Sequence, residues 1–193
     1  MADLSELRKE FEKIDKQADE NNKVIMTLKE TSRGGKNKNE FLCESIESVY
    51  NFEKYVDFKE KIEKNSNFKG KRFDALYMHD NILYCIEFKI ERCANINKQE
   101  IDEKFLDSFE ILKYIFRELH LQIRDYTFNF YVVFKDFENF FARRKVGDKC
   151  SLALQHRLVS LKKIKFSNLT ININTDCKSG FLQIYNQIFN TKY

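Results

Sequence analysis

The chain has 193 residues, a length that suits one domain, and 42% of them are hydrophobic, which is enough for a sizeable core. Its net charge of +4, with 33% charged residues, permits a polyanionic partner without demanding one. No long uninterrupted apolar run is present, which excludes a membrane-spanning helix, and the scattered histidines argue against a zinc site.

Residues 1–30 are predicted to form one long helix, because their apolar residues recur at alternating steps of three and four. A polar residue, Asn21, interrupts this stripe. Two interpretations stay open: a helix pair that makes a homodimer, or a helix that packs the stripe on its own domain. The stripe comprises Leu4, Leu7, Phe11, Ile14, Ala18, Asn21, Ile25 and Leu28.

A basic loop follows over residues 31–39, where Gly34 and Gly35 end the first helix. A second helix is predicted from Glu40 to about Lys64, with apolar residues at helical spacing along one face. Three acids share another side of this helix and would form either a solvated face or part of a binding site. They are Glu40, Glu44 and Glu47.

Residues 71–90 are predicted to form a β-hairpin, because two aromatic and aliphatic runs flank Asp80-Asn81, a pair that suits a tight turn. In this register Asp74 lies directly opposite Glu87, and strand alternation puts Glu87 and Lys89 on the same face. Two opposed carboxylates repel, so the pair calls for a cation such as Mg²⁺, which takes hard oxygen ligands. The alternative is ordinary surface charge on a solvated hairpin.

The motif Phe73-Asp74, a spacer of twelve residues and then Glu87-Phe88-Lys89 resembles the core of the PD-(D/E)XK nuclease superfamily. The resemblance covers roughly residues 37–135, although Phe73 stands where that family usually has proline. It implies a restriction-endonuclease-like α/β fold: a mixed central sheet flanked by helices, in the order helix, three-stranded meander, helix, strand.

The same resemblance implies a metal-dependent nuclease that uses Mg²⁺ or Mn²⁺. Asp74, Glu87 and the backbone carbonyl of Phe88 would hold the metal, and Lys89 would position the attacking water. The first core helix of the family often adds a carboxylate, and Glu44 is the candidate here.

A strong amphipathic helix is predicted from Gln99 to about Leu119, and a strand from Tyr126 to Phe134 that would run parallel to the hairpin's second strand. Lys104 and Ser108 on that helix could reach a phosphate, but a solvated or capping role is the preferred interpretation. Residues 136–145 carry phenylalanines at helical spacing beside a basic run, and residues 152–165 carry another basic cluster. Residues 169–173 alternate like a strand, and Gly180 opens a final short helix.

The expected organisation is an N-terminal helix, residues 1–30, and a nuclease domain, residues 37–193. The expected function is hydrolysis of phosphodiesters in nucleic acid, DNA rather than RNA; a non-catalytic nucleic-acid-binding or assembly subunit is the alternative. The five cysteines are odd in number and lack Cys-x-x-Cys spacing, so we expect reduced thiols and a cytoplasmic location.

Overall fold

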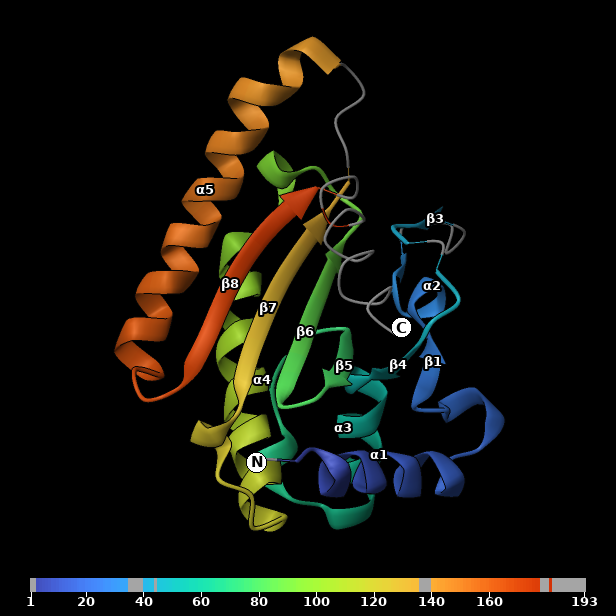
Figure 1. The fold of residues 1–193 in the computed structure, drawn as a ribbon. Coiled ribbons are helices and arrows are strands. Elements are labelled where there is room, and N and C mark those ends of the chain that lie inside the picture. The colour runs from blue at the N-terminus through green and yellow to red at the C-terminus, as the bar shows by residue number, and fades with distance from the viewer. Residues whose placement is uncertain (1–2, 35–39, 44, 136–139, 178–180, 182–193) are drawn as a thin grey trace.

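The computed structural model describes residues 3–34, 40–43, 45–135, 140–177 and 181. A six-stranded sheet of order β1-β4-β5-β6-β7-β8 forms its centre (Figure 1). Strands β1 (Ile25–Thr27), β4 (Ser48–Asn51), β5 (Ala75–His79) and β6 (Ile82–Lys89) pair antiparallel. Strands β7 (Thr127–Phe134) and β8 (Thr170–Cys177) continue the sheet parallel to β6. The chain is therefore α/β with a mixed sheet.

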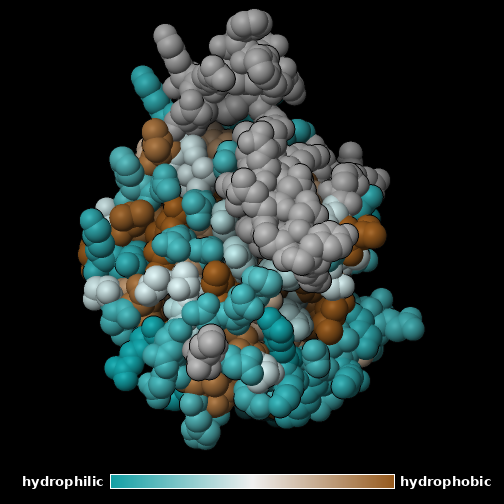
Figure 2. Space-filling model, in the orientation of Figure 1, coloured by the Kyte–Doolittle hydropathy of each residue, from teal (hydrophilic) through white to brown (hydrophobic). Residues whose placement is uncertain are grey.

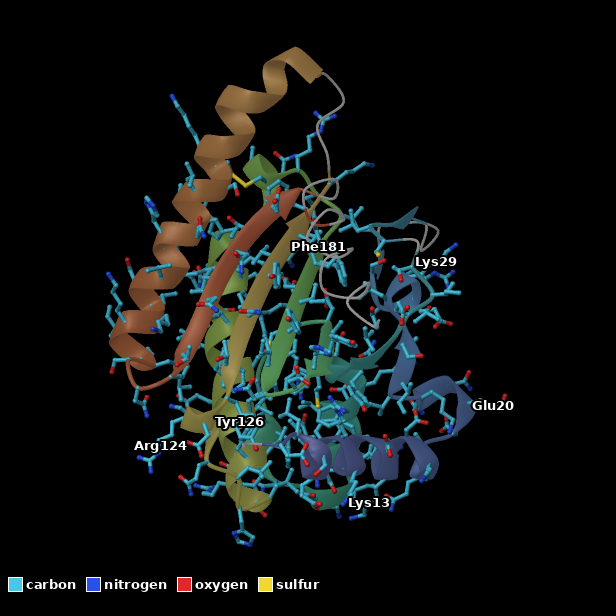
Figure 3. The ribbon with its side chains drawn as sticks, viewed as in Figure 1. Lys13, Glu20, Lys29, Arg124, Tyr126 and Phe181 are labelled. Carbon is cyan, nitrogen blue, oxygen red and sulfur yellow. A yellow bond between two sulfur atoms is a disulfide. The ribbon has the colours of Figure 1, made fainter. Side chains whose placement is uncertain are left out.

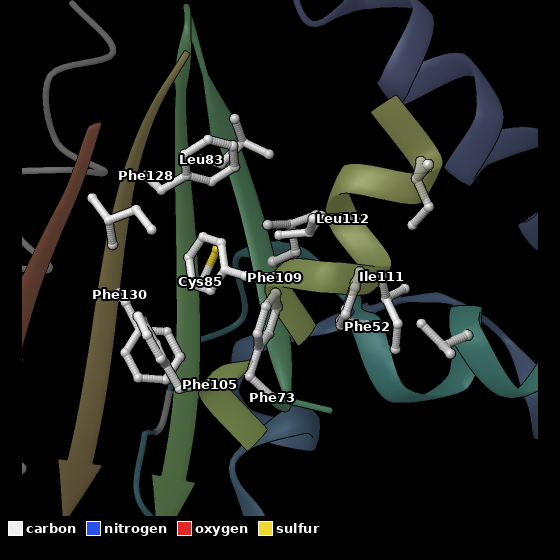
Figure 4. Packing of buried hydrophobic residues seen from close by; sticks show 14 of the residues in the cluster. Phe52, Phe73, Leu83, Cys85, Phe105, Phe109, Ile111, Leu112, Phe128 and Phe130 are labelled. Carbon is white, nitrogen blue, oxygen red and sulfur yellow. The ribbon is translucent and has the colours of Figure 1, made fainter. Parts of the chain in front are cut away.

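Two helices make the parallel crossovers: α4 (Lys98–Glu118) joins β6 to β7, and α5 (Phe140–Lys165) joins β7 to β8. The apolar stripe of α4 packs on the sheet through phenylalanine rings, shown in Figure 4. The ring centroid of Phe109 lies 5.4 Å from that of Phe128, and Phe105 lies 5.1 Å from Phe130. Each such fully buried side chain contributes about 1.5–3 kcal/mol, so this interface anchors α4 firmly.

The predicted hairpin is confirmed. Strand β5 pairs with β6 in the expected register, with His79 opposite Ile82 and Ala75 opposite Ile86. Asp80 takes a positive φ of 50°, which the turn requires and which aspartate tolerates. Strand β8 extends this same sheet, which the alternating pattern of residues 169–173 did not by itself predict.

The prediction of one helix over residues 1–30 is wrong. Helix α1 covers Ser5–Gln17, and a 3₁₀ turn (Glu20–Asn22), β1 and the short α2 (Leu28–Thr31) follow it. The chain turns back because an Asp15 Oδ1 atom accepts hydrogen bonds from the N–H groups of Val24 and Ile25, at 2.8 and 2.9 Å. Thr27 and Glu30 then form a capping box that starts α2.

The apolar stripe of α1 packs on its own domain, which is the second of the two interpretations. Phe11 is fully buried, and its ring centroid lies 3.9 Å from that of Tyr55. A surface already covered in this way is not available as a helix-pair interface. The buried members on α1 and next to it are Leu4, Leu7, Phe11, Ile14 and Ala18.

The predicted helix over residues 40–64 is half right. Helix α3 covers Phe52–Glu63, but β4 precedes it, and Glu40–Phe41 form the short β3, which pairs with β2 (Arg33–Gly34). The break comes at Asn51, whose side chain accepts a hydrogen bond from the Lys54 N–H at 2.9 Å and caps α3. Glu40 and Glu47 therefore do not lie on a helix, and Glu44 lies outside the described residues.

The expectation that all the cysteines are reduced is contradicted by a disulfide between Cys93 and Cys150 (Figure 3). Cys93 begins a 3₁₀ turn (Cys93–Asn95) after β6, and Cys150 lies on α5. The bridge joins the connection between β6 and α4 to the next crossover helix, while Cys43 and Cys85 are buried and take no part in this bridge. Two further 3₁₀ turns are Ser66–Phe68 and Ile123–Asp125.

Of the C-terminal segments, residues 140–165 are described by the structure and the final helix mostly is not. One helix, α5, spans both segments with basic clusters, apart from residues 136–139, which lie outside the described residues. The final helix predicted from Gly180 lies outside the described residues except for Phe181, which is buried against Phe88 and Tyr131.

The described surface in Figure 2 carries apolar side chains in small groups separated by polar ones. In the described part of the chain, none of the helices combines the length and apolarity that crossing a bilayer needs.

Candidate active site

The hairpin brings Asp74 and Glu87 together at the end where β5 begins and β6 finishes. The Asp74 N–H donates to the Ile86 carbonyl at 3.0 Å, which extends the hairpin register by one residue. The Phe88 N–H donates to Asp74 Oδ2 at 2.6 Å and fixes that carboxylate against β6. Strand alternation then directs Asp74, Glu87 and Lys89 to the face covered by α4.

Helix α4 adds two charged side chains to this end of the sheet. The Lys104 ammonium lies 2.9 Å from Glu87 Oε1 and 3.4 Å from Asp74 Oδ1, so it contacts both carboxylates. The Lys89 ammonium lies 3.3 Å from Glu87 Oε1 and donates to Glu100 Oε1 at 2.6 Å. Three carboxylates and two ammonium groups therefore form one cluster.

The same helix holds the segment that leads into β5. Ser108 Oγ accepts a hydrogen bond from the Phe73 N–H at 2.9 Å, and Asp107 Oδ2 accepts one from the Lys71 N–H at 2.8 Å. Gly70, with φ of +124°, permits this approach, because a Cβ atom there would lie 2.8 Å from Asp107 Oδ2. Asp74 is therefore positioned by α4 as well as by the hairpin.

A cavity of about 450 Å³ opens beside Asp74. The first turn of α3 forms part of its wall, because the Phe52 N–H donates to the Asp74 carbonyl at 3.1 Å and places Glu53 next to the carboxylate. Glu53 lines this cavity, and desolvation together with the charge of Asp74 raises its pKa. The lining residues are Met26, Glu30, Thr31, Ser32, Arg33, Asn51, Glu53, Lys54, Asp74, Phe88 and Ile90.

The electrostatics of the cluster are dominated by burial. Glu87 is fully buried, and desolvation together with the charge of Asp74 raises its pKa to about 8. Desolvation also raises the pKa of Asp74, against the opposing effect of Lys104. Burial alone would lower the pKa of Lys104, but Asp74 and Glu87 together raise it above its ordinary value. Both carboxyl groups therefore hold a proton more tightly than a free carboxyl group does, even with Lys104 between them.

The donor set fits a hard divalent cation. Glu87 Oε1 is buried without a hydrogen bond, although the Lys104 and Lys89 ammonium groups lie within ion-pair distance of it. Mg²⁺ is commonly bound by one or two carboxylates and several waters, which is what Asp74 and Glu87 offer. Within the described ranges, no group of three or more His, Cys, Asp or Glu side chains could hold a metal ion, so water would have to complete the coordination.

The structure brings together three of the predicted site residues, Asp74, Glu87 and Lys89. Phe88 contributes through its N–H, which donates to Asp74 Oδ2. The Phe88 ring lies on the opposite face, with Phe181, and its carbonyl as a ligand stays a prediction. Glu44 cannot be placed, since it lies outside the described residues.

Sequence reasoning missed Glu53 and Glu100 and undervalued Lys104 and Ser108. One signal was present: Glu100, Lys104 and Ser108 are spaced four residues apart, so they share one face of α4. Nothing local indicated Glu53, because the prediction placed it in the middle of a helix rather than at its start.

The fold and the site together define an α/β protein with an acidic pair and lysines at the end of a mixed sheet. No family model, curated protein or solved structure matches this chain.

Proposed function

We propose that this chain is a metal-dependent nuclease that hydrolyses phosphodiester bonds in nucleic acid, DNA rather than RNA, with Mg²⁺ or Mn²⁺. The observation that carries the proposal is the opposed pair Asp74 and Glu87 on one face, with Glu87 buried, Asp74 half-buried, Lys89 beside Glu87 and a cavity beside Asp74. The strand order also supports it, since an antiparallel meander, β4-β5-β6, is followed by α4 and the parallel β7. In a restriction-endonuclease-like core, however, the first helix precedes the meander, whereas α3 lies between β4 and β5.

In this proposal Asp74 and Glu87 hold the cation, and the Phe88 N–H keeps Asp74 in place. A bound divalent cation would stabilise the negative charge that develops on the phosphate. Lys89 positions the attacking water by donating a hydrogen bond to it, and Glu100 holds the Lys89 ammonium in that direction. The water adds to phosphorus and releases a proton to solvent, the bond to the leaving oxygen breaks, and that oxygen takes up a proton from solvent.

The substrate would enter through the cavity beside Asp74. Arg33 and Lys54 line this cavity and supply positive charge near a phosphate backbone. An open, polar cavity suits a hydrated polyanion.

The test is a cleavage assay on plasmid DNA and on DNA and RNA oligonucleotides, with Mg²⁺, Mn²⁺ or EDTA. We expect Glu87→Gln and Lys89→Met to lower the rate by at least about a hundredfold, as removal of a general acid–base or electrostatic group does. Lys113→Met is the matched control, because Lys113 lies on α4 and contacts Glu110, at 3.0 Å, and the Phe166 ring, 4.7 Å from its centroid, but not the acidic pair. Equal cleavage by all four proteins, or none by the wild type on any substrate, overturns the proposal.

A second candidate is a non-catalytic nucleic-acid-binding or assembly subunit. It is favoured by one observation: Lys104 already lies between the two carboxylates and contacts both of them from within the chain. Binding that weakens steeply with salt, persists in EDTA and is unchanged in Glu87→Gln would support this function over the first.

A further inference from the structure

Lys104 lies where a cation shared by the two carboxylates would lie. Its ammonium is 2.9 and 3.0 Å from the two oxygens of Glu87 and 3.4 Å from Asp74 Oδ1. Resting on the proposed function, we infer that Lys104 is an internal cation that competes with the divalent metal for Asp74 and Glu87. Metal binding then requires that Lys104 leave the pair.

The two cations exclude one another for electrostatic and chemical reasons. A dication coordinated by Asp74 and Glu87 would lie within a few ångströms of the Lys104 ammonium, and like charges repel strongly at that separation in a buried site. The ammonium also uses oxygen lone pairs that the metal needs: one Glu87 oxygen accepts a hydrogen bond from Lys104.

Lys104 has the means to leave. It lies near the N-terminal end of α4, its side chain is 17% exposed, and its four-carbon stem is flexible. Lys89 differs, because its ammonium donates at 2.6 Å to Glu100, which lies outside the acidic pair. The two lysines therefore have separate roles: Lys89 stays in place as metal enters, and Lys104 gives way.

Divalent binding without nucleic acid tests this inference. Mg²⁺ and Mn²⁺ are titrated calorimetrically into the wild type, Lys104→Met, Lys104→Arg and Lys113→Met. We expect Lys104→Met to bind at least tenfold more tightly than the wild type, with Lys104→Arg and Lys113→Met close to the wild type. Adding Glu87→Gln to Lys104→Met should abolish the tight site.

The outcomes separate the inference from the nuclease proposal. Wild-type binding that Lys104→Met does not strengthen overturns the inference and leaves the metal site standing. If neither the wild type nor Lys104→Met binds the metal, the inference is overturned as well. Tight, Glu87-dependent binding by Lys104→Met supports it even where the cleavage assay finds no nuclease.

A measurement on the unmodified chain covers the case in which Lys104→Met does not fold. Reductive methylation, followed by mass spectrometry, reports how accessible each lysine amine is. We expect labelling of Lys104 to rise at least threefold in saturating Mg²⁺ relative to EDTA, while labelling of Lys113 stays unchanged. Equal labelling of Lys104 in the two conditions overturns the inference.

Discussion

The hydroxyl of Ser108 accepts a hydrogen bond from the Phe73 N–H at 2.9 Å, and both residues are fully buried. Through this contact, α4 fixes the residue that precedes Asp74. The helix that covers the sheet therefore also sets the geometry of the carboxylate pair.

Replacing Ser108 with alanine should destabilise the fold by about 1–3 kcal/mol, because the Phe73 N–H would stay buried without a partner. Urea unfolding measures the change. Ser160→Ala is the control, since Ser160 is exposed and bonds only to the His156 carbonyl of its own helix. A cost for Ser108→Ala no larger than that control would contradict the role assigned to the contact.

The unfolding free energy should fall as the pH rises from about 4.5 to about 8 in EDTA. Burial and Asp74 raise the pKa of Glu87 from 4.5 to about 8, so over this range the folded chain holds a proton that the unfolded chain releases. The contribution is fully present below pH 4.5 and is lost as the pH passes through 8. It amounts to a few kcal/mol at most, at about 1.4 kcal/mol for each pKa unit.

Denaturant unfolding at a series of pH values measures this slope. Glu87→Gln should flatten it, whereas Glu110→Gln, on the exposed side of α4, should keep it. At pH 8 saturating Mg²⁺ should stabilise the wild type but not Glu87→Gln, because a ligand stabilises the state that binds it. A wild-type slope that Glu87→Gln leaves unchanged would show that Glu87 is not the titrating group.

Reduction of the Cys93–Cys150 disulfide should lower the unfolding free energy by about 2–4 kcal/mol, because the bridge closes a loop between residues 57 apart. Cys93→Ser should cost about as much and be insensitive to reductant, while Cys43→Ser should keep the wild-type sensitivity. Thiol titration of the unfolded, unreduced chain should find no more than three thiols among its five cysteines. A count of five would rule the bridge out.

Phe11→Ala should destabilise the fold by about 3–5 kcal/mol, as removal of a buried phenylalanine does. Its ring packs on Tyr55 and Tyr50, at centroid distances of 3.9 and 5.0 Å. Urea unfolding measures the cost, with Leu152→Ala, at a residue 50% exposed, as a control that should change little.

Light scattering adds a separate check on α1. Its apolar stripe lies in the domain core, so the mass in solution should be the same for the wild type and a folded Phe11→Ala. A dimer that Phe11→Ala converts to monomers would restore the intermolecular interpretation of this stripe.

The local pattern of the sequence was sufficient for the hairpin and for α4. Alternation with period two and a turn at Asp80-Asn81 determine the register that puts Asp74 opposite Glu87, since a slip of one residue would reverse every side chain. A long periodic segment is the kind of structure that sequence predicts best, and the apolar stripe of α4 has helical spacing throughout. Its five positions are Ile101, Phe105, Phe109, Leu112 and Phe116.

The N-terminal third was not predictable in the same way. Residues 21–28 continue the helical spacing of α1, yet Ile25–Thr27 form a strand because β4 lies beside them. Residues 48–51 likewise form a strand because β1 and β5 pair with its two edges. Tertiary hydrogen bonds outweigh a weak local preference in such short segments.

Strand alternation and the turn at Asp80-Asn81 were enough to place two acids and a lysine on one face at one end of a hairpin. What surrounds them came from the fold: Lys104 between the acids, Glu100 on Lys89, and Glu53 at the start of α3. These contacts join residues 11 to 30 positions apart, and they depend on how α3 and α4 pack on the sheet. That packing is settled by burial of the whole core, which no local pattern encodes.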